Sequence, residues 1–362
     1  MRYSSVRLFS CVKRFFHQRK YSTFLNEDVK SIPHCPVMAS ETVCYLKPSD
    51  GDLVIDMTFG AGGHTKHLLE FCPSLRIIAL DRDPVAFSYA QKLADLYPNQ
   101  ITPLLGKFSE LPALLAKLNI KQNSVDGILF DFGCSSMQFD VAERGFSLSK
   151  DGPLDMRMDG DRFPNTPTAS DVLAMSDEED LIKIFKVYGE EKLAKKIARG
   201  IVEARYTFKT FRSTRELADF ISGICDKDYR LDKMQRNAHI ATKVFQALRI
   251  FVNNELNEIN YAMIVAQRYL KVGGRMVTIC FHSLEDTIVK RHIAGHTVDN
   301  SVSKLPQKYI NYAKSHDLEA VEEVLASPWS MIHRHVITPT EDEVIINPRS
   351  RSAKLRAAVK LR

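Results

Sequence analysis

The sequence lacks the features of several protein classes. Its seven cysteines form no C-x-x-C pair and have no histidine at zinc-ligand spacing, so we expect no metal site. No stretch of 18 or more apolar residues occurs, so we expect no membrane span. Internal repeats and low-complexity tracts are also absent. With 362 residues, 44% of them hydrophobic, the chain can bury a full core and a second, smaller one.

The first 22 residues lack acidic side chains. They carry six basic ones, and the rest of the chain carries 44 of each sign, so a chain without this leader would be nearly neutral. The leader is rich in Ser, Phe and Val but has no long apolar centre, which is typical of a mitochondrial transit peptide rather than a secretory signal. We therefore predict a transit peptide at 1–22 and a location in the mitochondrial matrix. A basic RNA-binding arm is the alternative.

One stretch, VIDMTFGAGGHT at 54–65, joins a short apolar strand pattern to a glycine cluster and the start of a helix pattern. Its glycines let the backbone turn sharply and approach a ligand, and the helix N-terminus offers unpaired N–H groups. The spacing lacks the third glycine of the dinucleotide fingerprint, which disfavours an oxidoreductase. Asp56-x-x-x-Gly60-x-Gly62 instead fits the loop of class I methyltransferases, so S-adenosylmethionine is the predicted ligand. An ordinary tight turn is the alternative.

An acidic residue supports the ligand interpretation. The apolar run RIIAL at 76–80 ends at Asp81, which lies 21 residues beyond Gly60. A Rossmann-type fold places a carboxylate at about this position, where it binds ribose hydroxyls. Asp83 follows closely, but Pro84 begins a helix pattern, so we assign Asp83 to the cap of that helix.

Strand and helix patterns then alternate, which predicts an α/β fold with a mostly parallel sheet. Strands are expected at 53–55, 76–80, 101–105 and 125–132, with helices at 64–71, 84–96 and 109–118. The fourth strand ends at Asp131, at the edge where open α/β sheets bind ligands. Phe108 follows the third strand and is either a ring that packs on adenine or a core residue.

The alternation breaks after the fourth strand. A long polar, glycine-rich segment extends to Asp159, and only helix patterns follow over about 166–232. A strand pattern returns at 275–281, so about 100 residues are inserted into one domain rather than appended to it. We expect helices at 169–175, 176–188 with Ser176 as N-cap, 190–206 and 213–225, and one or two helices over 238–266. An exposed polar excursion is expected at 299–327, and final strands at 336–338 and 354–360.

Two clusters of basic side chains are candidates for contact with a polyanion. Lys192, Lys195, Lys196 and Arg199 recur at helical spacing on one face, although such a face is also typical of a solvated surface. The second cluster is the acid-free tail at 349–362, part of which we expect to be a strand, so that only alternate residues reach solvent. The helix is the favoured candidate.

Ten ordered motifs carry a specific resemblance. Together they are similar to the MraW family of small-subunit ribosomal RNA cytosine-N4 methyltransferases, over about residues 34–361, and the leader suggests a mitochondrial member. The motifs are GxGGH at 60–64, LDRDP at 80–84, DGILFDFGCSS at 126–136, AERGFS at 142–147, DGPLDMRMD at 151–159, YGEE at 188–191, FQALRI at 245–250, GGR at 273–275, FHSLED at 281–286 and NPRSRS at 347–352.

The resemblance implies a class I (Rossmann-like) methyltransferase domain at 34–135 and 236–362, with an inserted loop and helical RNA-recognition domain at 136–235. The implied methyl donor is S-adenosylmethionine, and the implied partner is small-subunit ribosomal RNA or an assembly intermediate of the small subunit. The sequence does not predict the oligomeric state. Cofactor contacts are expected from Gly62, Gly63, His64, Asp81, Phe108, Asp131 and Gln138.

The sequence also departs from the family pattern at three positions. Ala61 stands where many relatives carry Arg, and Cys134 stands where Val is common. Met137 stands where a Pro often precedes the Gln, so the backbone before Gln138 is less fixed.

Asp131 is the predicted catalytic residue. The amine of cytosine is a poor nucleophile because its lone pair is delocalised into the ring, and a carboxylate that accepts an amine hydrogen would localise that pair. The same carboxylate could instead bind the cofactor.

His282 and Ser283 either line the target pocket or form a packed turn. A binding module, which uses the cofactor pocket in ribosome assembly without turnover, is the alternative function.

Overall fold

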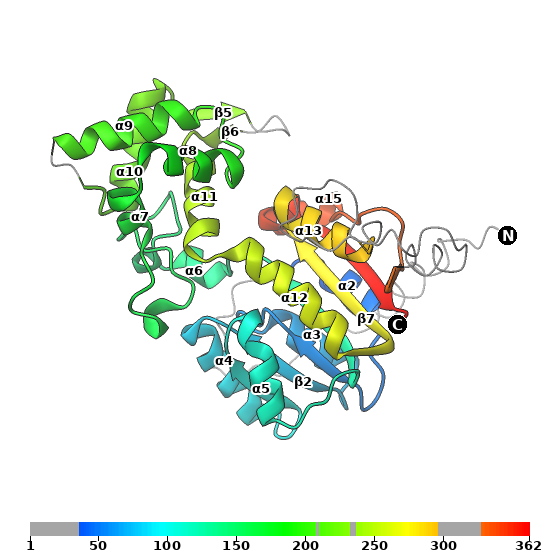
Figure 1. The fold of residues 1–362 in the computed structure, drawn as a ribbon. Helices are drawn as coiled ribbons and strands as arrows, with labels where there is room; N and C mark the ends of the chain where they lie inside the picture. The colour runs from blue at the N-terminus through cyan, green and yellow to red at the C-terminus, as the bar shows by residue number, and fades with distance from the viewer. Residues whose placement is uncertain (1–35, 208–209, 232–236, 296–326) are drawn as a thin grey trace, which may run out of the picture.

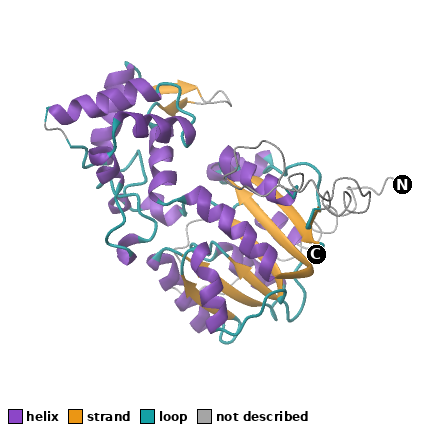
Figure 2. Cartoon of the chain, viewed as in Figure 1, coloured by secondary structure: helices purple, strands orange, loops and turns teal. Residues whose placement is uncertain are grey.

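The computed structural model describes residues 36–207, 210–231, 237–295 and 327–362. The chain forms two lobes, one built on a large sheet and the other almost wholly helical (Figures 1 and 2). The predicted transit peptide lies outside the described residues, as does nearly all of the polar segment at 299–327.

Seven strands form the main sheet in the order β3-β2-β1-β4-β7-β9-β8. The first five strands of this order pair in parallel, and β9 pairs antiparallel with both β7 and β8. The predicted α/β fold with a mostly parallel sheet is therefore confirmed. The strands are β1 (Leu53–Asp56), β2 (Arg76–Asp81), β3 (Ile101–Leu105), β4 (Val125–Asp131), β7 (Leu270–Cys280), β8 (Trp329–Met331) and β9 (Lys354–Lys360).

Helices cover both faces of this sheet. Every residue of β1 is buried, which explains why the strand appears in the sequence as a continuous apolar run. One face packs on α2 (Ala39–Leu46), α3 (Gly63–Phe71) and α4 (Pro84–Leu96). The other face packs on α5 (Leu111–Lys117), α12 (Glu255–Tyr269) and α13 (Ser283–Ile293).

The helical lobe has a core of its own. Along α9, Ile197 and Ile201 are fully buried on one stripe, while the lysines of the opposite face are exposed. The same core includes Val244 and Leu248, so it continues beyond the predicted boundary at 235. Figure 1 shows α12 leading from this lobe across the sheet. The helices are α7 (Ala169–Met175), α8 (Glu178–Val187), α9 (Ala194–Tyr206), α10 (Thr214–Cys225) and α11 (Thr242–Val252).

Two predictions about strands were wrong. The region expected to hold only helices contains β5 (Tyr229–Leu231), which pairs antiparallel with β6 (Asn237–His239). The strand expected at 336–338 is absent, because Ile337 makes only an isolated bridge to Leu355, and β8 instead pairs with the end of β9. Strands of three residues carry almost no alternation pattern, so their partners determine where they form.

Two predicted helix starts were also wrong. The N-cap of α8 is Asp177, whose Oδ1 accepts the N–H of Asp180 at 2.8 Å, while Ser176 ends α7. The third helix begins at Ala194 rather than 190, because Glu190 has a φ of 49°. Either Ser or Asp can cap a helix, so the sequence alone did not decide between two adjacent residues.

Candidate active site

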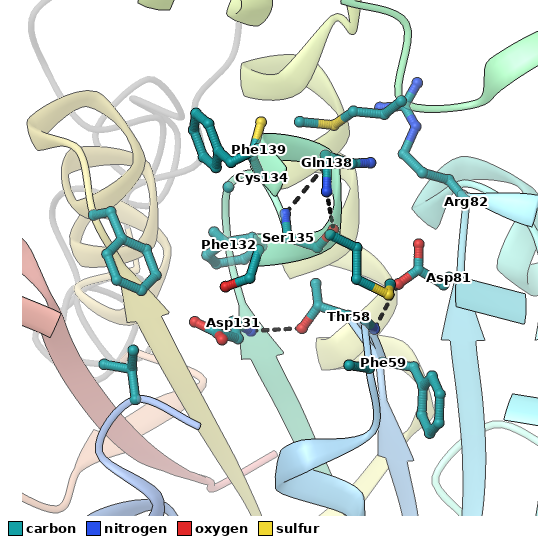
Figure 3. Close-up of a pocket in the computed structure, with 18 of the residues that line it drawn as sticks. Thr58, Phe59, Asp81, Arg82, Asp131, Phe132, Cys134, Ser135, Gln138 and Phe139 are labelled. Carbon is teal, nitrogen blue, oxygen red and sulfur yellow. Dashed lines mark hydrogen bonds between the residues drawn. The ribbon is translucent and has the colours of Figure 1, made fainter. Parts of the chain in front are cut away.

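A cleft of about 610 Å³ lies at the C-terminal edge of the parallel strands (Figure 3). Its walls come from the turns after β1, β2, β3 and β4 and from the short helix α6 (Ser136–Asp140). Pro36 and Arg349, from segments far apart in the sequence, also line it. The volume is within the range of about 300–1,000 Å³ that is typical of small-molecule sites. The sheet therefore places a ligand-sized cleft where open α/β folds bind ligands.

The glycine turn forms one wall of the cleft. Asp56 at the end of β1 holds the turn, since its Oδ2 accepts the hydroxyl of Thr65 at 2.7 Å. Gly62 has a φ of 79°, and a Cβ there would lie 2.6 Å from the Phe59 ring. The turn thus needs glycine at this position for its own packing. Gly63 lines the cleft and Gly62 does not, so cofactor contact by Gly62 stays a prediction.

Asp81, at the end of β2, holds the same turn from the other side. Its Oδ2 accepts the N–H of Gly60 at 2.7 Å, and its Oδ1 accepts the N–H of Asp83 at 2.9 Å. Burial raises the pKa of Asp81 to about 6. Asp81 also lines the cleft, so its carboxylate is placed where a hydroxyl donor of a ligand could reach it.

Phe108 lies between the cleft and the core. Its ring meets Phe130 edge-on, with 5.9 Å between the ring centroids, and meets Phe132 at 6.1 Å. It also lines the cleft. Phe108 therefore packs on the core and also lines the cleft, and its contact with adenine stays a prediction.

Asp131 and His64 are brought together from β4 and α3. The backbone N–H of Asp131 donates to Thr58 Oγ1 at 2.6 Å, and Asp131 Oδ2 lies 3.6 Å from His64 Nε2 (Figure 3 for the Asp131–Thr58 bond). Within the described chain, three buried atoms have no hydrogen-bond partner. They are both ring nitrogens of His64 and the Oδ1 of Asp131. His64 is only 7% exposed, and leaving a buried polar group unpaired costs about 1–3 kcal/mol. Both residues line the cleft, so these atoms mark where a ligand would bind.

Gln138 lines the cleft, but the protein already uses both ends of its amide. Its Oε1 accepts the N–H of Ser135 at 3.1 Å, and its Nε2 donates to Asp83 Oδ2 at 2.9 Å. The capping role predicted for Asp83 is confirmed, since its Oδ1 accepts the N–H of Val85 at 2.9 Å. Asp83 Oδ2 also binds Arg144 at 2.6 Å. The structure thus shows a positioning role for Gln138, and its cofactor contact stays a prediction.

The carboxylate of Asp159, which was not predicted from the sequence as a site residue, joins the two lobes. Arg82, just after β2, binds Asp159 through two guanidinium nitrogens, and the Nε–Oδ1 distance is 3.1 Å. Asp159 is buried and also binds Arg162 at 3.4 Å. Arg82 additionally donates to the carbonyl of Asn253 at 3.0 Å. The dense alternating charges of the motifs at 80–84 and 151–159 were the available signal for this contact.

The FHS segment after β7 forms a packed turn. His282 caps α13, since its Nδ1 accepts the N–H of Leu284 at 3.3 Å, and Ser283 Oγ donates to Glu190 at 3.1 Å. The cleft lining includes neither residue. The packed-turn interpretation therefore agrees with the structure.

In the described ranges, no group of three His, Cys, Asp or Glu side chains is arranged to hold a metal ion. None of the helices in these ranges is both long enough and apolar enough to cross a membrane.

Comparison with known proteins gives the family. The sequence pattern of the MraW methylase family matches residues 31–361. The chain is 50% identical over 336 residues to a Mus musculus protein named 12S rRNA N(4)-cytidine methyltransferase METTL15, a match that covers 91% of this chain and 82% of that protein. It is 42% identical over 328 residues to a Parvibaculum lavamentivorans protein named Ribosomal RNA small subunit methyltransferase H, covering 90% and 89% respectively.

A third relative matches over only a small part of its own length. A Culex quinquefasciatus protein with the name receptor-type tyrosine-protein phosphatase mosPTP-1 is 60% identical over 332 residues. This match covers 92% of the chain but only 22% of that protein, so its name assigns no activity here.

The family match over nearly all of the described structure, with a sheet order and cleft typical of cofactor-binding α/β enzymes, shows that the chain belongs to the MraW methylase family.

Proposed function

We propose that this methylase transfers a methyl group from S-adenosylmethionine to the exocyclic N4 of a cytosine in mitochondrial small-subunit ribosomal RNA. The observation that carries the proposal is the Asp131 carboxylate, which lines the cleft beside the glycine turn. Its buried Oδ1 has no hydrogen-bond partner among the described residues. The names of the mouse and Parvibaculum relatives support the RNA substrate.

The cleft residues fit S-adenosylmethionine. Gly63 at the start of α3 leaves backbone exposed to the cleft, and a Cβ there would lie 3.2 Å from Pro36. Asp81 supplies a carboxylate for the ribose hydroxyls, and Phe108 supplies an aromatic face for the adenine. When bound, the cofactor supplies a methyl group on positively charged sulfur, which makes the carbon electrophilic.

The protein then has to orient the target amine and accept a proton from it. Correct orientation alone can lower a reaction barrier by about 7–11 kcal/mol at most. In our proposal the Asp131 Oδ1 accepts a hydrogen of the amine, which localises the nitrogen lone pair. The N–H of Asp131 is bonded to Thr58, so the backbone that carries this carboxylate is fixed. The cytosine has to be unpaired to reach the cleft, as RNA-modifying enzymes generally require.

The inserted lobe is the proposed RNA-recognition surface. Lys192, just before α9, and Lys195 and Lys196 on α9 are exposed and form no ion pair with the described residues, whereas Arg199 lies 3.5 Å from Glu178. The C-terminal tail is less available. Arg356 binds Asp286 at 2.6 Å, and the buried Lys360 donates to the carbonyl of Leu270 at 2.8 Å.

We expect Lys192→Gln, Lys195→Gln and Lys196→Gln together to weaken RNA binding and reduce its salt dependence. Each lost single-strand phosphate contact should lower the slope of log affinity against log salt by about 0.7. The measurement is a salt titration of RNA affinity. A matched control neutralises three exposed lysines of the sheet lobe, Lys92, Lys117 and Lys121, and should leave the slope unchanged. If both triple variants kept the wild-type slope, the face of Lys192, Lys195 and Lys196 would be an ordinary solvated surface.

The mitochondrial location rests on the acid-free leader and on the 12S rRNA in the name of the mouse relative. The test is to map N4-methylcytosine in organellar small-subunit RNA from cells with and without the protein. We expect the mark to disappear without the protein and to return with the full chain. A mark that persists in the absence of the protein would contradict the proposed substrate.

The same cells test the leader. A chain that lacks residues 1–22 should fold normally but fail to restore the mark, because it is not imported. Its distribution between organelle and cytosol, measured by fractionation, provides the direct comparison. Recovery of the shortened chain in mitochondria would contradict the transit-peptide assignment.

A further inference from the structure

His64 is a buried imidazole with no structural task that the described chain reveals. It lies at the start of α3, one residue beyond the glycine that lines the cleft, and is only 7% exposed. Neither ring nitrogen has a hydrogen-bond partner among the described residues. Asp131 Oδ2 lies 3.6 Å from Nε2. The position of His64 beside the proposed catalytic carboxylate suggests a role in moving a proton.

The groups that face His64 come from four elements. Asp56 lies at the end of β1, Asp131 at the end of β4, and Glu343 on α15 (Glu341–Ile346), while His67 is one turn further along α3. Burial opposes a charge on His64, but the three carboxylates outweigh it and raise its pKa above the ordinary value. Glu343 is held in place by the N–H of Met38, which its Oε1 accepts at 2.7 Å. The surroundings therefore favour an imidazolium when no other cation is near.

We propose that His64 is the final acceptor of the proton that the target amine releases. Asp131 takes this proton from the amine and passes it to His64. This rests on the proposed function, since it needs an amine nucleophile beside Asp131. Asp131 has the two oxygens that such a relay requires. Its Oδ1, which no other part of the described structure hydrogen-bonds, can accept from the amine, and its Oδ2 faces His64. The 3.6 Å gap would have to shorten by about half an ångström in the complex, which is common for catalytic contacts that tighten when substrate binds.

The step balances in atoms and charge. The nitrogen lone pair forms the bond to the methyl carbon, and the carbon–sulfur bond breaks with its electron pair on sulfur. The proton leaves nitrogen for Asp131 Oδ1. Rotation of the protonated carboxyl group then turns this O–H towards His64, and Asp131 gives the same proton to His64 Nε2. The starting charges are one positive sulfonium and one carboxylate. The final charges are one imidazolium and one carboxylate, so the positive charge moves from sulfur to His64 and the net charge of the site is unchanged.

This conservation of charge gives His64 a reason to respond to the cofactor. A sulfonium in the same cleft would repel an imidazolium and hold His64 neutral, ready to accept a proton. The neutral thioether of S-adenosylhomocysteine would remove that repulsion, and the three carboxylates would again favour the charged ring. His64 would thus be neutral and able to accept a proton in the substrate complex, and it would keep that proton in the product complex, where its pKa is higher.

The decisive measurement uses the wild-type chain without RNA. We expect the NMR titration midpoint of His64 to be lower with S-adenosylmethionine than with S-adenosylhomocysteine, by about one pH unit or more. Calorimetry in buffers of different ionisation enthalpy should show that the first ligand releases more protons at neutral pH than the second. Equal midpoints and equal proton release for the two ligands would overturn the proposal. Because no RNA is present, this result is independent of the substrate assignment.

Variants extend the test to catalysis. His64→Gln should lower the single-turnover rate of methyl transfer by about 100-fold and remove the difference in proton release, while S-adenosylhomocysteine still binds. His67→Gln, on the same helix, is the matched control and should keep both the rate and the difference. If His64→Gln does not fold, the wild-type titration still decides. A folded His64→Gln that keeps the wild-type rate and pH profile would show that Asp131 releases the proton by another route. Normal proton release with no transfer to any RNA would contradict the proposed function alone.

Discussion

Asp131→Asn is expected to lower the rate of methyl transfer to RNA by about 100- to 10,000-fold, the usual contribution of a general base. Asparagine keeps the shape of the side chain but cannot take up a proton. If Asp131 acts as the acceptor, the loss should appear in kcat. If its carboxylate only binds the cofactor, the loss should appear in the KM for S-adenosylmethionine. Single-turnover and steady-state kinetics together distinguish the two roles left open by the sequence.

The matched control is Asp126→Asn, which makes the same change at the other end of β4. Asp126 Oδ2 accepts the N–H of Leu53 at 2.8 Å and lies outside the cleft lining. We expect this variant to keep its kcat. Full activity of folded Asp131→Asn would show that orientation of the amine suffices and that no base is needed. Cells carrying inactive Asp131→Asn also test the binding-module alternative, because normal ribosome assembly there would show that turnover is dispensable.

Asp81→Ala is expected to weaken cofactor binding by about 10- to 100-fold, because hydrogen bonds to charged groups contribute about 1.5–3 kcal/mol. Calorimetry with S-adenosylhomocysteine is the suitable measurement, since this ligand has the ribose but no sulfonium that would affect His64. Asp95→Ala, an exposed change on α4, is the control and should bind normally. Unchanged affinity in Asp81→Ala would remove the ribose assignment.

The pH dependence of binding gives a second test of Asp81. Its pKa in the free protein is about 6, and the carboxylate form accepts the hydroxyl hydrogens. Affinity for S-adenosylhomocysteine should therefore be full well above pH 6 and should fall as the pH drops through this value and the carboxylate is protonated. In Asp81→Asn this fall should be absent. A wild-type affinity that stays constant through the same range would contradict a contact with the ionised group.

Local patterns determined most of the individual strands and helices from the sequence alone. The strands at 101–105 and 354–360 and the helices at 84–96 and 169–175 form where their apolar spacing and caps predict. Such signals depend on neighbours within about one helical turn or one strand, so a linear reading is enough to find them. The glycine turn and Asp81 were found for the same reason, because their spacing in the sequence fixes their geometry in a strand–turn–helix unit.

Tertiary structure alone decided which side chains meet. Asp131 reaches His64 because β4 pairs beside β1, so their C-terminal ends lie at one edge of the sheet. Arg82 and Asp159 are 77 residues apart and meet only because the inserted lobe folds back onto the end of β2. The register of the antiparallel edge likewise decided that β8, and not the segment at 336–338, pairs with β9 as a strand. Local patterns determine elements, whereas contacts between distant charges depend on strand order and lobe placement, which no short window of sequence contains.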